Sequence, residues 1–306
     1  MWNNGLKKSN SREMWLDIAK CFGILLVVLN HLGKNIPIVS FFGGMFYMPL
    51  FFVAAGYTYR KKEESYGTYV LGKAKRLLIP YAVCNVLLFL FFTLRTGWSK
   101  PSLLGIFYSR TMLMKPTSQW NMGLMSILNA PTWFLTCLFL CLCIYGWIDR
   151  TTETAKKRRT FVAAGMGIGI LLQYVSPVLL PWSLENALYF LGLIELGRFL
   201  KEDGLSWLRK NEWIYANFLI LFVALSYANG SVNVSIDQYG RSMLLYFFTG
   251  ALGSMLCMKA AELTEQYGKV LAKPLALIGR HTLTILCWHL FAIEVITKVL
   301  QFLGMC

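Results

Sequence analysis

Three ionisable side chains, Asp17, Lys20 and His31, share one apolar stretch near the start of the chain and could carry chemistry. If residues 16–33 are helical, this spacing places all three within about 60° on one face, with Asp17 and His31 about 21 Å apart along the axis. Ionisable groups facing hydrocarbon are costly, so a polar stripe on a membrane helix usually faces a bundle interior or a watery cavity. The stripe therefore predicts a wall of an active site or of a transport path.

Histidine is the residue type best suited to proton transfer, and the chain has only three: His31, His281 and His289. A neutral imidazole is a good general base near neutral pH, and acylation of a hydroxyl needs such a base. His31 closes the polar stripe directly after Asn30, so we predict that His31 is functional. His289 lies deep in the last apolar run, where a functional role and a packing role are equally expected. His281 fits a polar residue at the membrane interface.

Lys73 and Arg76 open the third apolar run. Side chains at i and i+3 of a helix project together, and a Lys–Arg pair suits a donor that carries phosphate. From the residues alone, ordinary positive charge at the inner end of a membrane helix is the simpler explanation. Both interpretations stay open.

Two further residues could contact a substrate at the other ends of the apolar runs. Trp133 begins the fourth run at the outer interface, where it could contact a substrate or anchor the helix. Glu185, followed by Asn186, begins the sixth run and could meet an acceptor or serve helix entry. Within the second run, Met48–Tyr57 combines a proline with small residues, which predicts either a helix break that lines a cavity or close helix packing.

The composition predicts one polytopic membrane domain spanning residues 1–306. Of the 306 residues 56% are hydrophobic and only 15% are charged, and the mean hydropathy is +0.51. A soluble domain has about 25% charged residues. The apolar runs are 16–33, 38–58, 77–94, 132–148, 161–180, 184–200, 212–228, 242–258 and 275–303. The last run is long for one span, so it either bends or forms a span followed by a short second helix, and we predict an all-α bundle of nine or ten spans.

The loops set the expected orientation. The net charge of +15 comes mainly from basic residues in loops that alternate to one side, which is therefore cytoplasmic together with residues 1–15. This distribution argues against nucleic acid as the partner. The first run lacks a small-residue cleavage site, so it should stay as an anchor. Residues 95–131, with Arg110 and Lys115, should lie along the outer surface.

The eight cysteines show no paired metal-binding spacing, and most lie within apolar runs. We predict small buried hydrophobic residues and no metal site.

Several segments together resemble the acyltransferase-3 family of integral membrane O-acyltransferases, nearest to its fucose 4-O-acetylase-like branch. The resemblance covers nearly the whole chain. Its motifs are Asp17-x-x-Lys20 with Val27-Val28-x-x-His31, Met48-Pro49-Leu50-Phe51-Phe52 with Gly56-Tyr57, Arg76-Leu77-Leu78-Ile79-Pro80-Tyr81, Trp133-Phe134-Leu135, Tyr239-Gly240, and Ile278-Gly279 with His289.

The resemblance implies a helical domain of about ten spans in the bacterial cytoplasmic membrane. It implies transfer of an acetyl group from cytoplasmic acetyl-CoA to a hydroxyl of a cell-surface glycan or of a lipid-linked sugar. Carried over by position, His31 is the catalytic base, Asp17 and Lys20 support it, and Lys73 and Arg76 contact the donor. Asn30, Tyr47, Trp133, Glu185 and His289 are the expected substrate contacts. Membrane lipids are the remaining expected partners, and self-association into a homo-oligomer stays open.

Two departures from the branch leave an alternative open. This chain has Tyr47 where the branch usually has histidine, and Ala55 where it usually has serine. Loss of this histidine and of this serine hydroxyl fits either a changed acceptor or a domain that binds without catalysis. A domain that binds without catalysis would resemble the membrane half of membrane-bound amino-acid racemases. A membrane scaffold without a ligand is disfavoured by the polar stripe.

Overall fold

The computed structural model describes residues 13–32, 36–61, 63–115, 128–204, 206, 208 and 211–304. Over these residues the chain is helical, apart from loops and two isolated bridge contacts, so the all-α prediction is confirmed. The α-helices are α1 (Met14–Asn30), α2 (Gly44–Tyr57), α3 (Tyr66–Thr96), α4 (Lys100–Tyr108), α5 (Trp133–Thr151), α6 (Ala155–Val175), α7 (Leu184–Tyr189), α8 (Leu191–Phe199), α10 (Ile214–Asn229), α11 (Met243–Tyr267), α12 (Lys269–Arg280) and α13 (Thr282–Phe302). Short π- or 3₁₀-helical turns adjoin them: η1 (Val39–Gly43), η2 (Ala130–Thr132), η3 (Pro181–Ser183), η4 (Leu200–Gly204) and η5 (Val234–Ile236).

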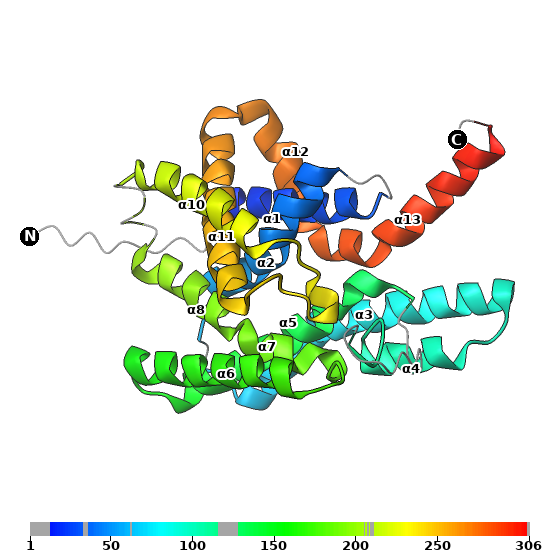
Figure 1. Ribbon diagram of the computed structural model, residues 1–306, viewed down its shortest axis with the longest axis horizontal. Coiled ribbons are helices and arrows are strands. Elements are labelled where there is room, and N and C mark those ends of the chain that lie inside the picture. The colour runs from blue at the N-terminus through cyan, green and yellow to red at the C-terminus, as the bar shows by residue number, and fades with distance from the viewer. Residues whose placement is uncertain are drawn as a thin grey trace, which may run out of the picture.

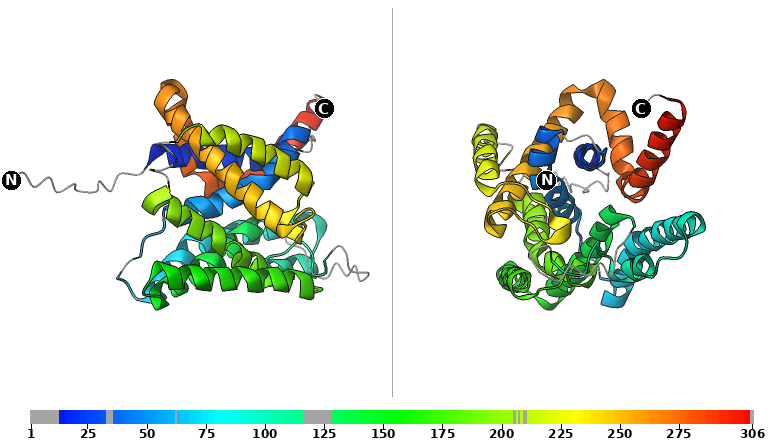
Figure 2. Two further views of the ribbon diagram at one scale, coloured as in Figure 1. Left: turned by 60° about the vertical axis from the view of Figure 1, so that its left-hand side comes forward. Right: turned by 45° about the vertical axis from the view of Figure 1, so that its right-hand side comes forward.

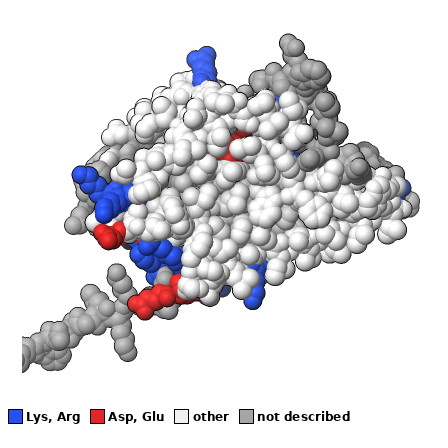
Figure 3. All heavy atoms as spheres, turned by 90° about the horizontal axis from the view of Figure 1, so that it is seen from below, with Lys and Arg blue, Asp and Glu red and all other residues white. Residues whose placement is uncertain are grey.

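Five helical stretches of the described chain are long and apolar enough to cross a membrane. They are Val39–Tyr57, Tyr66–Arg95, Ala130–Thr151, Met243–Tyr267 and Thr282–Phe302. Figure 3 shows one face of the molecule as a wide uncharged area, with charged side chains gathered mainly toward one end. The chain is therefore an integral membrane protein. The count of nine or ten spans and the cytoplasmic N-terminus remain predictions, and most of residues 1–15 lies outside the described part.

Helix α1 lies inside the bundle, where α2, α11, α12 and α13 pack around it (Figure 2). Its apolar residues face these neighbours, and Ile18, Ile24 and Val27 are at most 1% exposed. Gly279 of α12 lies directly on α1: a Cβ atom at this position would stand 1.7 Å from the Asp17 carbonyl oxygen. Only glycine permits this approach, which brings the polar stripe against α12.

Helix α2 crosses α8 with equally close backbones. A Cβ on Gly56 would lie 2.0 Å from the Ile194 oxygen, and a Cβ on Gly197 would lie 2.0 Å from the Val53 oxygen. Small residues allow membrane helices to pack this closely. Because α2 continues through Pro49 without interruption, the predicted helix break is not observed, whereas the predicted close packing is.

The last apolar run divides into two helices at His281, and the short helix precedes the long one instead of following it. Helix α12 ends at Arg280 and α13 begins at Thr282. Beyond this junction α13 projects away from the bundle (Figure 1), and its far end exposes Val299, Phe302 and Leu303. The near end of α13 returns to α1 and carries His289 there.

Candidate active site

A cavity of about 700 Å³ lies among α1, α2, α3, α5 and the α12–α13 junction; we call it the basic cavity. Part of its wall is apolar, with Ile24, Phe51 and Phe134. Six cationic side chains also line it: Lys20, Arg60, Lys73, Arg76, Lys201 and Arg280. This combination suits a ligand with an anionic end and a long uncharged arm.

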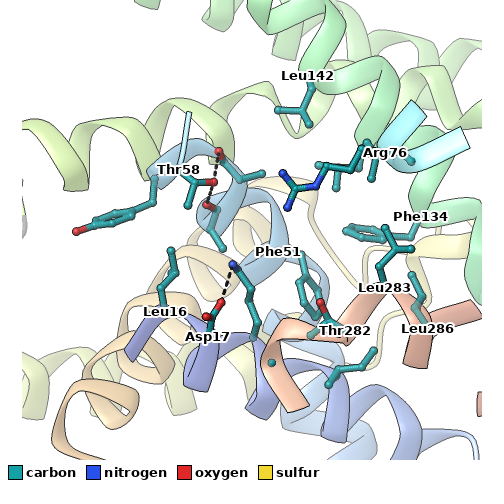
Figure 4. Close-up of a pocket in the computed structure, with 18 of the residues that line it drawn as sticks. Leu16, Asp17, Phe51, Thr58, Arg76, Phe134, Leu142, Thr282, Leu283 and Leu286 are labelled. Carbon is teal, nitrogen blue, oxygen red and sulfur yellow. Dashed lines mark hydrogen bonds and ion pairs between the residues drawn. The ribbon is translucent and has the colours of Figure 1, made fainter. Parts of the chain in front are cut away.

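Asp17 holds two of these cations in place. Its carboxylate is only 1% exposed and lies 3.4 Å from Lys20 Nζ and 3.5 Å from Arg280 Nε. The Asp17–Lys20 pair is drawn in Figure 4. A buried carboxylate between two cations compensates their charge and fixes their positions along the cavity wall.

Lys73 and Arg76 reach the same cavity from α3. Lys73 Nζ lies 5.1 Å from the centre of the Tyr69 ring. Arg76 extends from α3 into the space between Thr58, Phe51 and Phe134 (Figure 4). Among the described residues its guanidinium has no hydrogen-bond or ion-pair partner, so its donors are available to a ligand.

A second cavity, of about 500 Å³, contains the first histidine; we call it the histidine cavity. The residues around it come from the end of α1, the η1–α2 segment, the start of α5 and the loop before α11. They are Asn30, His31, Pro37, Ser40, Phe41, Gly44, Tyr47, Met48, Ala130, Pro131, Trp133, Ser231, Val232, Asn233, Val234 and Ser235. With His31 neutral, none of these side chains carries a charge.

His31 occupies the position that ends α1. Its Nδ1 lies 2.7 Å from the Val27 carbonyl oxygen, and because a carbonyl only accepts, Nδ1 carries the proton. The lone pair is therefore on Nε2, as a general base requires. The ring lies edge-on to His289, with centroids 5.1 Å apart.

The two cavities meet at a thin wall. Met48 lines both of them. Val27 lines the basic cavity, while its carbonyl accepts the hydrogen bond from His31 in the histidine cavity. The basic cavity therefore adjoins the position of His31 across this wall.

A buried ion cluster holds the loop that closes the histidine cavity. Arg110 is 0% exposed, contacts Glu185, and lies 3.2 Å from Asp237 Oδ1. It also donates to the Ser235 carbonyl at 3.2 Å. Asn186 donates to Asp237 at 3.2 Å from the adjacent helix α7. Arg110, which was expected on the outer surface, is instead fully buried, because it is the counter-ion of two buried carboxylates.

Burial shifts the pKa values of Asp237 and Lys115, which lie in the loops of this cluster, outside the spans. It raises the pKa of Asp237, while Arg110 and Lys115 oppose that rise. It lowers the pKa of Lys115, while Asp237 opposes that fall. Each charge thus depends on its partners, and removal of one would leave the others uncompensated.

A second network, at the end of the molecule near Arg60, connects three helices. Tyr59 donates to Asp149 at 3.0 Å, and burial together with Asp149 raises the pKa of Tyr59. Glu195 and Arg198 are three residues apart on α8 and could pair with each other. Instead Glu195 accepts from Arg158 at 2.9 and 3.0 Å, whereas Arg198 contacts Asp149. The pairs therefore tie α5, α6 and α8 together.

The structure divides the predicted site residues between the two cavities. Asp17, Lys20, Lys73 and Arg76 line the basic cavity. Asn30, His31, Tyr47 and Trp133 line the histidine cavity, and His289 contacts His31. Glu185 lines neither of these two cavities and is bound to Arg110. Asp17 and Lys20 thus lie with the α3 cations rather than beside His31.

No group of three or more His, Cys, Asp or Glu side chains that could hold a metal ion occurs within the described ranges. The seven described cysteines are free and buried, as predicted. The acyltransferase-3 family model, described as an acyltransferase domain, matches residues 14–305. No curated protein and no solved structure was found to match the chain.

Proposed function

The chain belongs to the acyltransferase-3 family, and from that premise we propose that it is a multi-pass O-acyltransferase of the bacterial cytoplasmic membrane. It moves an acetyl group, or a similar acyl group, from acyl-CoA to a hydroxyl of a cell-surface glycan or of a lipid-linked sugar. The observation that carries this proposal is the meeting of a cationic cavity with a cavity that presents His31.

The basic cavity is assigned to acetyl-CoA. The donor has phosphates at one end and a long neutral arm that ends in a thioester. The cations fit the phosphates, and the apolar wall with Phe51 and Phe134 fits the arm. Ala55, where the family branch usually has serine, also lines this cavity and makes its wall less polar.

The reaction occurs at the shared wall. His31 Nε2 takes the proton of the acceptor hydroxyl while the oxygen attacks the thioester carbon. The new O–C bond forms, the C–S bond breaks, and the electron pair leaves with the CoA sulfur. The imidazolium then returns its proton to the thiolate, which yields the ester, the free thiol of CoA and neutral His31.

The acceptor lies in the histidine cavity. Its amide and hydroxyl groups, including Asn30, Asn233 and Ser235, can exchange hydrogen bonds with sugar hydroxyls, and Trp133 offers an apolar surface. Tyr47 occupies the position of the missing histidine and keeps a hydroxyl at this wall. The absence of charged side chains in this lining favours an uncharged sugar unit.

The same neutrality weighs against the amino-acid-binding alternative. A free amino acid carries an ammonium and a carboxylate, and both need counter-charges or strong hydrogen bonds when they leave water. The histidine cavity supplies no ionic partner for either group. Acetyl-CoA binding to the purified protein separates the two functions, because an amino-acid binder should ignore it.

Replacement of His31 tests the proposal. His31→Ala should lower acetyl transfer by about 10²–10⁴, because it removes the general base. Transfer is measured as radiolabelled acetyl incorporated into membrane glycans, with folding checked by size-exclusion chromatography and thermal melting in detergent. His281→Ala is the control, since His281 lines neither cavity. Unchanged acetyl transfer by His31→Ala would contradict the assignment of His31 as the general base.

Comparison of surface glycans from cells with and without this protein identifies the acceptor. Mass spectrometry should show the loss of one acyl unit per modified sugar, and its mass distinguishes acetyl from succinyl. Identical glycan profiles, with the protein expressed and folded, would argue for the binding function instead.

A further inference from the structure

His289 approaches His31 from the other end of the chain. The two rings lie on α13 and at the end of α1, with centroids 5.1 Å apart and planes inclined at 68°. His289 is 5% exposed. Two imidazoles in contact, one of them buried, need an explanation beyond that of a single base.

The backbone fixes the tautomer of His289 as it fixes that of His31. His289 Nδ1 lies 3.0 Å from the Leu286 carbonyl oxygen and 3.1 Å from that of Ile285. Nδ1 therefore carries the proton, and Nε2 carries the lone pair. Among the described residues this buried Nε2 has no hydrogen-bond partner. A buried acceptor left unpaired is unfavourable, so a donor is expected to reach it during function.

The spacing of the rings fits a hydrogen bond between them. A linear N–H···N bond of about 2.9 Å between two imidazoles places their centroids about 5 Å apart. The observed 5.1 Å already has this value, so the two rings lie close enough for such a bond. With both Nδ1 atoms bound to carbonyls, the remaining nitrogens are the two Nε2 atoms, and neither has a proton of its own to offer.

We propose that His31 and His289 bind one proton between them, so that Nε2–H of protonated His31 donates to Nε2 of His289. When His31 takes the proton of the acceptor hydroxyl, His289 accepts this new N–H and stabilises the imidazolium until the CoA thiolate removes the proton. This catalytic use rests on the proposed function; the shared proton itself does not. His289 is thus the partner of the base and not a second base.

The residues around the pair leave His289 as the group that stabilises protonated His31. Among the described residues no carboxylate lies within ion-pair distance of either imidazole. Other titratable or charged groups on the elements around the pair include Asp17, Lys20 and Cys21 on α1, Tyr47 on α2, Cys84 on α3, Asp237 in the loop before α11, and Cys287, Glu294 and Lys298 on α13. Lys20 lies about 16 Å from His31 along α1. Asp237 and Glu294 are engaged by Arg110 and Lys298 respectively.

The chain suits a direct test because it has only three histidines. Full-length protein with ¹⁵N-labelled histidine is titrated in detergent micelles and followed by NMR. At high pH the nitrogen shifts should report the Nδ1–H tautomer for both His31 and His289. On acidification their signals should move together in a first step that adds one proton. The second proton should follow at least about one pH unit lower, because like charges repel.

His289→Asn is the diagnostic variant, with His281→Asn as its matched control. In His289→Asn, His31 should titrate in a single step with its midpoint at lower pH than the first step of the native pair. In His281→Asn, both steps should remain. Independent titration of the two native histidines, or an Nε2–H tautomer of His289, would overturn the proposal even if the variant failed to fold.

The experiment uses neither donor nor acceptor, so the two proposals fail separately. Coupled titration in a protein that transfers no acetyl group would retain the shared proton and remove the acyltransferase activity. Acetyl transfer by a protein whose histidines titrate independently would retain the acyltransferase activity and remove the shared proton.

Discussion

Neighbouring cationic side chains on α3 differ in whether they line the basic cavity. Lys73 and Arg76 line the basic cavity, whereas Lys75, between them, is exposed and does not. A charge that serves only membrane topology acts equally well from any of these positions. The comparison therefore separates donor binding from topology.

Arg76→Lys should weaken acetyl-CoA binding by about tenfold, because a guanidinium can hold a phosphate through two parallel hydrogen bonds and an ammonium cannot. Lys75→Gln should change it by less than about twofold. Binding is measured by calorimetry at two salt concentrations. Loss of both Lys73 and Arg76 should also leave the residual binding less sensitive to salt. Equal affinities in native protein and Arg76→Lys would remove Arg76 from the site.

At the residue scale, the sequence showed which polar residues lie in apolar runs, but it did not show which residues contact them. The stripe on α1 predicted one cavity wall for Asp17 and His31; they line two different cavities, and neither periodicity nor composition pairs His31 with a histidine on α13. Arg110 was missed because a lone arginine in a long loop is typical of a solvated surface. Only the tertiary structure places two carboxylates against it.

Individual helices are positioned by contacts that leave no room for a side chain. Gly279→Ala should destabilise the protein by about 1–3 kcal/mol, because its Cβ would overlap the Asp17 carbonyl and push α12 from α1. The same shift should move Arg280 from Asp17 and weaken donor binding. Thermal melting in detergent measures the first effect and calorimetry the second.

Gly72→Ala is the control, since Gly72 lies within α3 with open space around its Cβ position. This change should be neutral or stabilise the helix by about 0.5–1 kcal/mol. If both variants melt alike, the close approach of α1 and α12 does not limit stability.

Helix positions followed from the apolar runs, whereas pairing between helices did not. A second helix in the last run was expected from its length, although after the span and not before it, and most helices lie close to the predicted runs. The spacing of Glu195 and Arg198 would also allow a pair within one helix. The observed pairs join different helices, because Arg158 from α6 offers Glu195 two hydrogen bonds at once.

For the whole molecule, the arrangement of the cavities predicts which residues face each side of the membrane. With the N-terminus inside, Thr58→Cys at the basic cavity should react with an impermeant maleimide only from the cytoplasmic side. Ser231→Cys at the histidine cavity should react only from the outside. The seven described native cysteines are buried, so Cys306→Ser provides a suitable background. Labelling of both positions from one side would contradict the proposed orientation.

The wall formed by Met48 also has an electrical consequence. In the proposed orientation, two cavities that enter from opposite sides concentrate the membrane voltage across the short distance between them. One elementary charge that crosses the whole voltage changes its free energy by about 2.3 kcal/mol per 100 mV. A proton that leaves a hydroxyl in the histidine cavity for a sulfur in the basic cavity moves inward, in the direction that an inside-negative cell favours. The acyl group crosses in the opposite direction, as the equivalent of an acyl cation, so a complete turnover carries no net charge and acyl transfer should proceed equally fast in energised and depolarised cells.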